Sequence, residues 1–126
     1  MQFLVKHAYI FLSIFFAVGS QLIIKWQMSE YDLSSYTTIM EKFKFSFSML
    51  LNPFIIFSVF LTLLSGLSWM IAMTKFDISY AYPFTTLGFV LVLITSTFLF
   101  SESLTWYKVI GTLFIIIGIF ITSKSI

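Results

Sequence analysis

A few polar side chains recur at helical spacing inside apolar segments of this 126-residue chain, and they are its main candidates for chemistry. In the segment from about residue 8 to residue 26, Gln21 and Lys25 are one helical turn apart, and Ser20 adjoins Gln21. Burying an amide and an ammonium group among apolar residues is costly. This stripe, which also includes Ser13 and Ala17, therefore favours a path of hydrogen-bonding groups that ends at a cation over simple packing.

Three later apolar segments carry similar stripes of small or hydroxylic residues. The stripe of the third segment, with Thr85 and Gly88, favours the same polar path. The stripes of the second and fourth favour close packing, because small residues let helices approach and hydroxyls bond across the contact. Gly111 and Gly118 are two turns apart on one helix face and form a candidate dimer seam. For every stripe, both a polar path and close packing remain open. The further members of the stripes are Ala81 and Thr95 in the third segment, Ser58, Thr62, Ser65, Gly66 and Trp69 in the second, and Thr122 in the fourth.

Other kinds of chemistry have little support in the sequence. The chain has no Cys, which removes thiol nucleophiles, disulfides and thiolate metal sites. Its single His, His7, has no partner at a metal-ligand spacing, so we expect neither a metal nor a cofactor. Seven Lys residues are scattered along the chain and give a net charge of only +2, which argues against nucleic acid as a partner.

The composition indicates where the helices that carry these residues lie. Hydrophobic residues make up 60% of the chain and charged residues 10%, against about 45–50% and about 25% in a soluble domain. Twelve charged residues cannot cover the surface of a soluble core. A soluble enzyme, a DNA-binding domain and a disordered tail are therefore disfavoured, and an integral membrane protein is indicated.

Four windows are long and apolar enough to cross a bilayer, which takes about 20 residues. They cover about residues 8–26, 53–74, 78–100 and 105–122, and every charged residue lies near a window end or in the first loop. We expect an all-α, four-helix transmembrane domain over residues 1–126. A cleaved signal peptide at the N-terminus is the alternative for the first window, but its apolar run exceeds a typical signal. The side of the membrane that holds the termini carries three Lys residues and the other side carries four. This difference is too small to predict the membrane orientation of the chain from the excess of positive charge on the cytoplasmic side.

The first loop, residues 27–52, is long and partly amphipathic. Ile39, Phe43, Phe47 and Leu50 share one face of a helix, which predicts a short helix at the membrane surface. The alternative is an extended segment, because residues 43–47 also alternate between Phe and polar residues. In the third window, Pro83 either kinks the helix or marks its first turn.

The motifs of the second half of the chain resemble a known family. Ser79-Tyr80-Ala81-Tyr82-Pro83, Leu87-Gly88-Phe89-Val90 and Ser101-Glu102-Ser103-Leu104 are followed by Ile110-Gly111 and Gly118. These motifs resemble the four-helix form of the drug/metabolite transporter superfamily. Within it the chain is similar to small multidrug resistance proteins and, more closely, to the subunits of the aminoarabinose–undecaprenyl-phosphate flippase, on the strength of Gln21-Leu22 with Lys25, Ala81-Tyr82-Pro83 and Glu102.

One departure bears on the substrate. Small multidrug resistance proteins have a glutamate in the first span that binds the proton and the cationic drug, whereas residues 8–24 of this chain contain no Asp or Glu. A cationic drug in hydrocarbon needs a counter-charge, and proton coupling needs a titrating group. A proton-coupled drug exporter is therefore the weaker alternative.

The flippase resemblance implies roles for individual residues. Lys25 would bind the phosphate of a polyprenyl-phosphate glycolipid, and hydrogen bonds to its sugar would come from Gln21, Ser20, Tyr80, Tyr82 and Thr85. Glu102, on the same membrane side as Lys25, would form an ion pair with it or bind sugar hydroxyls. Gly88, Gly111 and Gly118 would serve packing or dimerisation.

The resemblance also implies a location and partners. It places the chain in the bacterial inner membrane, as a non-enzymatic subunit of a transporter for lipid-linked sugars of the cell envelope. The partner would be an identical or a related four-helix subunit, with a membrane glycosyltransferase nearby. The alternatives are a small-molecule exporter and a non-transporting partner of a glycosyltransferase. No motif for nucleotide hydrolysis is present, so movement must follow a gradient or be coupled elsewhere.

Overall fold

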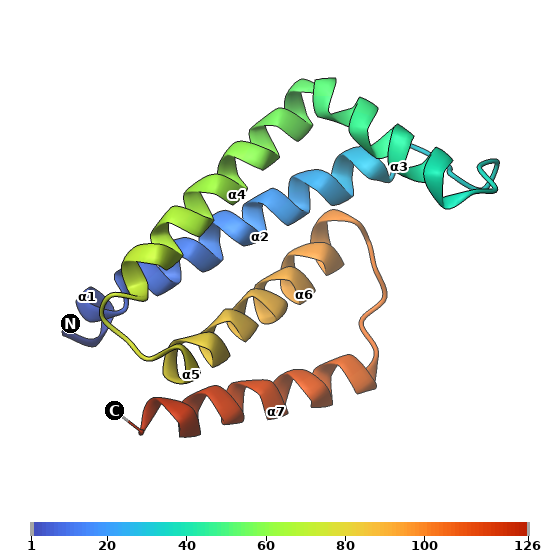
Figure 1. The fold of residues 1–126 in the computed structure, drawn as a ribbon. Helices are drawn as coiled ribbons and strands as arrows, with labels where there is room; N and C mark the ends of the chain where they lie inside the picture. Colours follow the sequence, from blue (N-terminus) through green and yellow to red (C-terminus); the bar gives the residue numbers. More distant parts are fainter. Residues whose placement is uncertain (1, 126) are drawn as a thin grey trace.

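In the computed structural model the chain is a set of helices, and residues 2–125 are described, without the side chain of Phe3. No strand occurs within that range, which confirms the all-α prediction. Figure 1 shows the long helices of the first and second spans side by side, followed by the third span and then the fourth on the side of the first span. The elements in chain order are α1 Gln2–Lys6, α2 Ala8–Met28, α3 Ile39–Ser48, η1 Met49–Leu51, α4 Pro53–Ala72, α5 Ile78–Ala81, η2 Tyr82–Thr86, α6 Leu87–Leu99 and α7 Trp106–Ser123.

The four predicted spans are confirmed within a few residues at their ends. Over the described part of the chain, four helical stretches are long and apolar enough to cross a membrane: Ala8–Met28, Pro53–Ala72, Ile78–Leu99 and Trp106–Ser123. The third combines α5, η2 and α6. Asn52 caps α4 by accepting the Phe54 N–H, at 2.8 Å, and Pro53 follows at the first helical position, where its missing N–H leaves no bond unmade.

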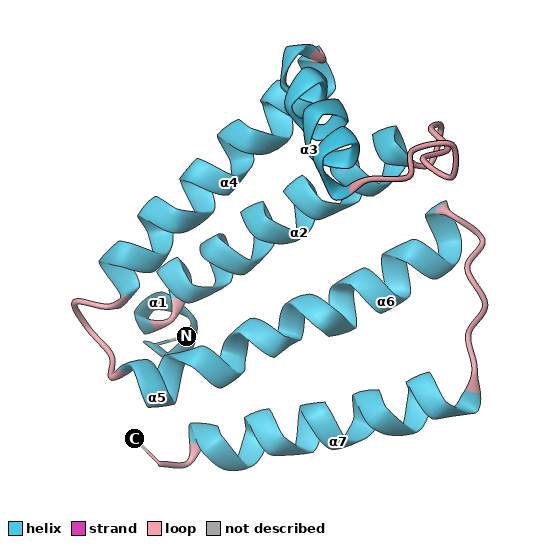
Figure 2. Ribbon diagram, turned by 45° about the vertical axis from the view of Figure 1, so that its right-hand side comes forward, coloured by secondary structure: helices cyan, strands magenta, loops and turns pink. Residues whose placement is uncertain are grey.

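Hydroxyl groups join α2 to α4 at two levels of their contact, and these helices lie side by side in both ribbon views (Figures 1 and 2). The Ser13 hydroxyl donates to the Ser65 carbonyl at 2.9 Å, and the Ser65 hydroxyl donates to the Ser13 carbonyl at 2.7 Å. One face of the first stripe therefore packs against the second stripe, instead of lining a path.

Replacing Ser20 with alanine should loosen this contact. The buried Ser20 hydroxyl donates to the Ser58 carbonyl at 2.8 Å and lies 2.7 Å from Thr62 Oγ1. Interhelical hydrogen bonds in membranes contribute about 0.6 kcal/mol on average and up to about 1.7 kcal/mol. We expect a loss of unfolding free energy in that range, measured by denaturant titration in detergent. Thr95→Ala is the control, because Thr95 donates within its own helix, to Leu91; an equal loss in both variants would contradict the interhelical role.

The third span approaches α2 at Gly88. A Cβ atom added there would lie 3.5 Å from Val18 Cγ2 and 3.8 Å from Ile14 Cγ2, which is ordinary van der Waals contact. The α7 glycines differ: no described atom outside the local helix comes within 4 Å of a Cβ atom built on Gly111 or Gly118. The structure thus gives Gly88 a packing contact and leaves the predicted seam of α7 open.

Pro83 stands where the third span changes its winding. It is the second residue of the 3₁₀ segment η2, between the α-helical turns of α5 and α6. Proline lacks an N–H and disturbs the α-helical ladder, which accounts for a local change inside a continuous span. The Thr85 and Thr86 hydroxyls donate to the carbonyls of Tyr82 and Pro83, both at 2.6 Å.

The first loop contains the predicted helix, α3, and the extended alternative is wrong. Thr38 accepts the Glu41 N–H at 3.2 Å, and the Glu41 carboxylate accepts the Thr37 N–H at 3.1 Å, a reciprocal cap that starts the helix. Before it, Asp32 accepts the Ser34 N–H at 2.9 Å, and this bond holds the pKa of the Asp32 carboxyl below its usual range. The predicted apolar face, formed by Ile39, Phe43 and Phe47 of α3 and Leu50 of η1, is exposed.

Spin labels can test whether this face lies on the membrane. The chain has no Cys, so single cysteines can be introduced directly. An amphipathic helix at the membrane surface buries its apolar face in the headgroup region. We expect a label at Phe47 to be relaxed by oxygen dissolved in the lipid, and a label at Lys44 by a water-soluble nickel chelate. Equal access of the chelate to both sites would argue against surface binding.

Candidate functional site

A groove between α2 and α6 brings together the stripes of the first and third spans. Its volume is about 360 Å³, and Gln21 of α2 and Thr85 of η2 are its polar members. The Gln21 side chain is exposed, and its amide can donate and accept. Thr85 uses its proton within the helix, which leaves its oxygen free to accept a bond from a ligand. The other lining residues are Ile14, Ala17, Val18, Gly88, Phe89 and Val92.

The predicted ion pair stands one helical turn beyond Gln21. Lys25 Nζ lies 3.8 Å from Glu102 Oε1, and the two side chains are 55% and 39% exposed. Exposed pairs of this kind contribute about 0–1 kcal/mol. Each charged group can therefore leave this ion pair and bind a ligand at little cost in free energy.

A strained residue places Glu102 at this position. Ser101 has φ of 54°, in the left-handed region, two residues after α6 ends at Leu99. The next residue bonds back to α6, because the Glu102 N–H donates to the Ser96 carbonyl at 3.5 Å.

Besides Lys25 and Glu102, three of the predicted ligand residues lie outside the groove. Ser20 is buried in the α2–α4 contact. Tyr82 is exposed, and its ring packs edge-on against Trp69 with a centroid distance of 6.0 Å. Tyr80 is buried and its hydroxyl lies 2.8 Å from Nε2 of His7. Along α2 this is about 27 Å from Lys25, at about 1.5 Å per residue, so Tyr80 and Lys25 stand at opposite membrane ends.

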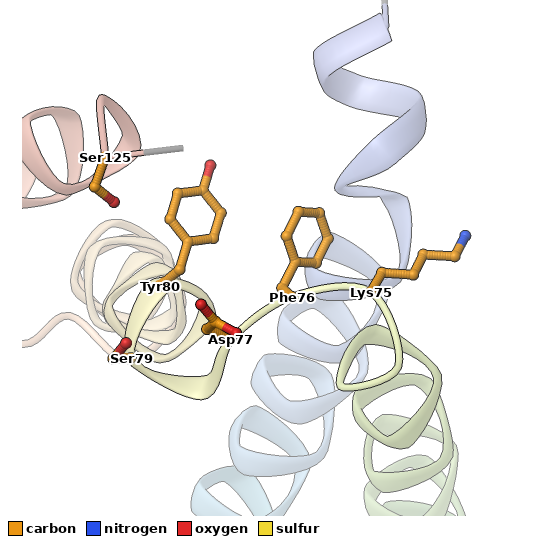
Figure 3. Close-up of a pocket in the computed structure, with 6 residues that line it drawn as sticks. All are labelled: Lys75, Phe76, Asp77, Ser79, Tyr80 and Ser125. Carbon is orange, nitrogen blue, oxygen red and sulfur yellow. The ribbon is translucent and has the colours of Figure 1, made fainter.

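No sequence pattern indicated the pairing between His7 and Tyr80. His7 precedes the first span, and 73 positions separate it from Tyr80. A second pocket, of about 290 Å³, opens beside Tyr80 and is lined by Lys75, Phe76, Asp77, Ser79 and Ser125 as well (Figure 3). Lys75 extends away from Tyr80 in this view. Within the described residues, no three His, Asp or Glu side chains gather as a metal site would require.

Comparisons with known proteins agree with this architecture. The probable 4-amino-4-deoxy-L-arabinose-phosphoundecaprenol flippase subunit ArnF of Yersinia enterocolitica is 34% identical over 117 residues, which cover 90% of this chain and 89% of the relative. The subunit of the same name from Serratia proteamaculans is 29% identical over 90% of this chain and 88% of its own length. No solved structure matches. The model of the EamA-like transporter family matches residues 4–124, and the chain therefore belongs to this family of integral membrane transport proteins.

Proposed function

We propose that this chain is a subunit of a flippase that moves an amino sugar linked to a polyprenyl phosphate across the bacterial cytoplasmic membrane, for modification of the cell envelope. Two relatives that cover nine-tenths of the chain are named as flippase subunits for 4-amino-4-deoxy-L-arabinose-phosphoundecaprenol. They are transport subunits by name and not enzymes, and the family model covers the same residues.

One observation carries the proposal: a mostly apolar groove with two polar groups leads along α2 to a weakly held cation. Ala17, Gln21 and Lys25 follow one another at intervals of four residues, on one face of the helix. The ammonium group of Lys25 suits a phosphodiester, and the amide of Gln21 suits a sugar. Glu102 would bind the hydroxyls or the amine of the sugar, and these contacts would replace its ion pair with Lys25 when the lipid binds.

The groove has no carboxylate among its lining residues, which weakens the drug-exporter alternative. A cationic drug would find its nearest described counter-charge at the Lys25–Glu102 end, where the carboxylate is already paired.

Mass spectrometry of the lipid that co-purifies with the chain tests this function. We expect a polyprenyl phosphate that carries an amino sugar. In parallel, a membrane-impermeant amine reagent added to intact cells should label less of this lipid when the gene is deleted, because less of it reaches the outer leaflet. Unchanged labelling, with no such lipid in the purified sample, would refute the function.

We further propose that α7 pairs with an identical or a related four-helix subunit, since its glycine face is open in the described chain. Leucine at Gly111 should block close approach and abolish crosslinking between subunits through cysteines placed on α7. Leucine at Gly66, whose position on α4 is also open, is the matched control. Crosslinking that survives in the Gly111 variant would place the seam elsewhere. A membrane glycosyltransferase as a further partner would appear in the same crosslinked samples.

A further inference from the structure

A histidine is buried where the first span meets the third. His7 lies between α1 and α2, yet its exposed fraction is only 2%. Its Nε2 lies 2.8 Å from the Tyr80 hydroxyl. Polar side chains are removed from water in this way only when they are hydrogen-bonded. His7 precedes the first span, so this buried imidazole adds a titratable group at the span's edge, while residues 8–24 still contain no Asp or Glu.

The surroundings of His7 can accommodate a positive charge. The centroid of its ring lies 4.7 Å from that of Phe76, 5.4 Å from that of Phe84 and 6.3 Å from that of Phe11. Aromatic rings within about 6 Å attract a cation. Protonation would therefore change the contacts of His7 without leaving the imidazolium unsupported.

A proton can reach His7 through Tyr80. The Tyr80 side chain lines the pocket of Figure 3, and its ring points into the space between Phe76 and Ser125. In the tautomer of neutral His7 that leaves Nε2 without a proton, the Tyr80 O–H donates to Nε2. When a hydronium ion in the pocket gives a proton to the Tyr80 oxygen and becomes water, the original hydroxyl proton passes to Nε2. The imidazolium N–H then donates to Tyr80, which keeps one proton, so one proton enters and the hydroxyl is regenerated.

Charged and titratable groups flank this site on every element around it, at its exposed rim. Lys6 is the last residue of α1. The ammonium group of Lys75 lies over the ring of Tyr9 in α2, 5.0 Å from the ring centroid. Asp77 lines the pocket next to Tyr80. At the end of α7, the Lys124 ammonium lies over Phe120 at 4.9 Å from the ring centroid.

The site is connected to the groove by a single short segment. Phe84 contacts His7, and the next residue, Thr85, lines the groove. Both belong to η2, the 3₁₀ turn around Pro83. A change in the contacts of His7 therefore acts on the segment that positions Thr85. Tyr82, also in η2, lies against Trp69 and can report such a change.

We propose that His7 and Tyr80 form a proton-binding site that controls the position of η2 and thereby the groove. Use of this site to drive lipid movement rests on the proposed function, but the site itself does not. Its ligand is a proton taken up from the membrane side that holds both termini.

Nuclear magnetic resonance tests the site without any substrate. Because the chain has one His, ¹⁵N-histidine labelling of the full chain in lipid nanodiscs reports His7 alone. We expect its ring ¹⁵N shifts to move reversibly as the sample is acidified, because a proton bound at Nε2 changes the ring nitrogens. In Tyr80→Phe the midpoint should shift, because the hydrogen-bond partner is gone. Ring shifts that stay constant on acidification, or an identical midpoint in Tyr80→Phe, would overturn the proposal.

Trp69 fluorescence tests the connection to η2. In a background with Trp26→Phe and Trp106→Phe, we expect the emission of Trp69 to change with the same midpoint as His7. The change should be lost in His7→Gln and kept in Lys75→Met, which removes an exposed charge at the same end. Trp69 emission that does not change with pH, or that still changes in His7→Gln, would refute the coupling between His7 and η2. No lipid substrate is present, so these results are independent of whether the proposed flippase activity is correct.

Discussion

Replacing Lys25 with alanine is expected to lower amino-sugar lipid transport by about tenfold to 150-fold. This range corresponds to the loss of one hydrogen bond to a charged group, about 1.5–3 kcal/mol. Folding should be nearly unaffected, because the 3.8 Å ion pair of Lys25 with Glu102 is exposed. The measurements are outer-leaflet labelling of the lipid amine in cells and the amount of lipid that co-purifies with the chain.

Two further variants separate a phosphate contact from a general effect of charge. Lys108→Ala removes a cation near the same membrane end, where its ammonium donates to the Ser103 carbonyl at 2.7 Å, and we expect transport to persist. Glu102→Gln frees Lys25 from its partner but also removes the carboxylate proposed to bind the sugar amine, so binding through the phosphate should persist while the preference for an amino sugar falls. If Lys25→Ala transports normally, or if Lys108→Ala loses as much activity, the phosphate does not bind at Lys25.

Leucine at Gly88 is expected to close the groove. The added side chain would extend past the Cβ position that already contacts Val18 and Ile14, both of which line the groove. Overfilling a packed contact costs about 1–3 kcal/mol, which corresponds to about a 5- to 150-fold effect on lipid binding if it falls on the bound state. We expect transport to fall by this factor, with lipid co-purification reduced in parallel.

The size of the substituent provides the control. Alanine at Gly88 places its Cβ in ordinary contact, 3.5 Å from Val18, and should retain most of the activity. Leucine at Gly66 adds the same bulk to α4 where no described atom outside the local helix lies within 4 Å of the new Cβ. Full activity in Gly88→Leu would show that the groove is not on the path of the lipid.

The spans and the loop helix could be predicted from the sequence because their signals are local. A run of about 20 apolar residues can satisfy its backbone in a bilayer only as a helix or in a closed barrel, so composition locates the spans. The spacing of Ile39, Phe43 and Phe47 likewise indicates α3, and the cap formed by Thr38 and Glu41 starts it. The same counting placed Lys25 and Glu102 at span ends on one membrane side, and the structure shows the ion pair that was one of the two alternatives for Glu102.

By itself, then, the sequence determined the four spans, which charges share a membrane side, and the two stripes from which Gln21 and Thr85 line the groove. Only the tertiary structure decided which neighbour each residue faces. Ser20 and Gln21 are adjacent in the chain but about 100° apart around α2, so one bonds to α4 and the other faces α6. His7 and Tyr80 meet across 73 positions. Helix spacing fixes angles within one helix, whereas the rotation of each helix against the next depends on packing between distant segments.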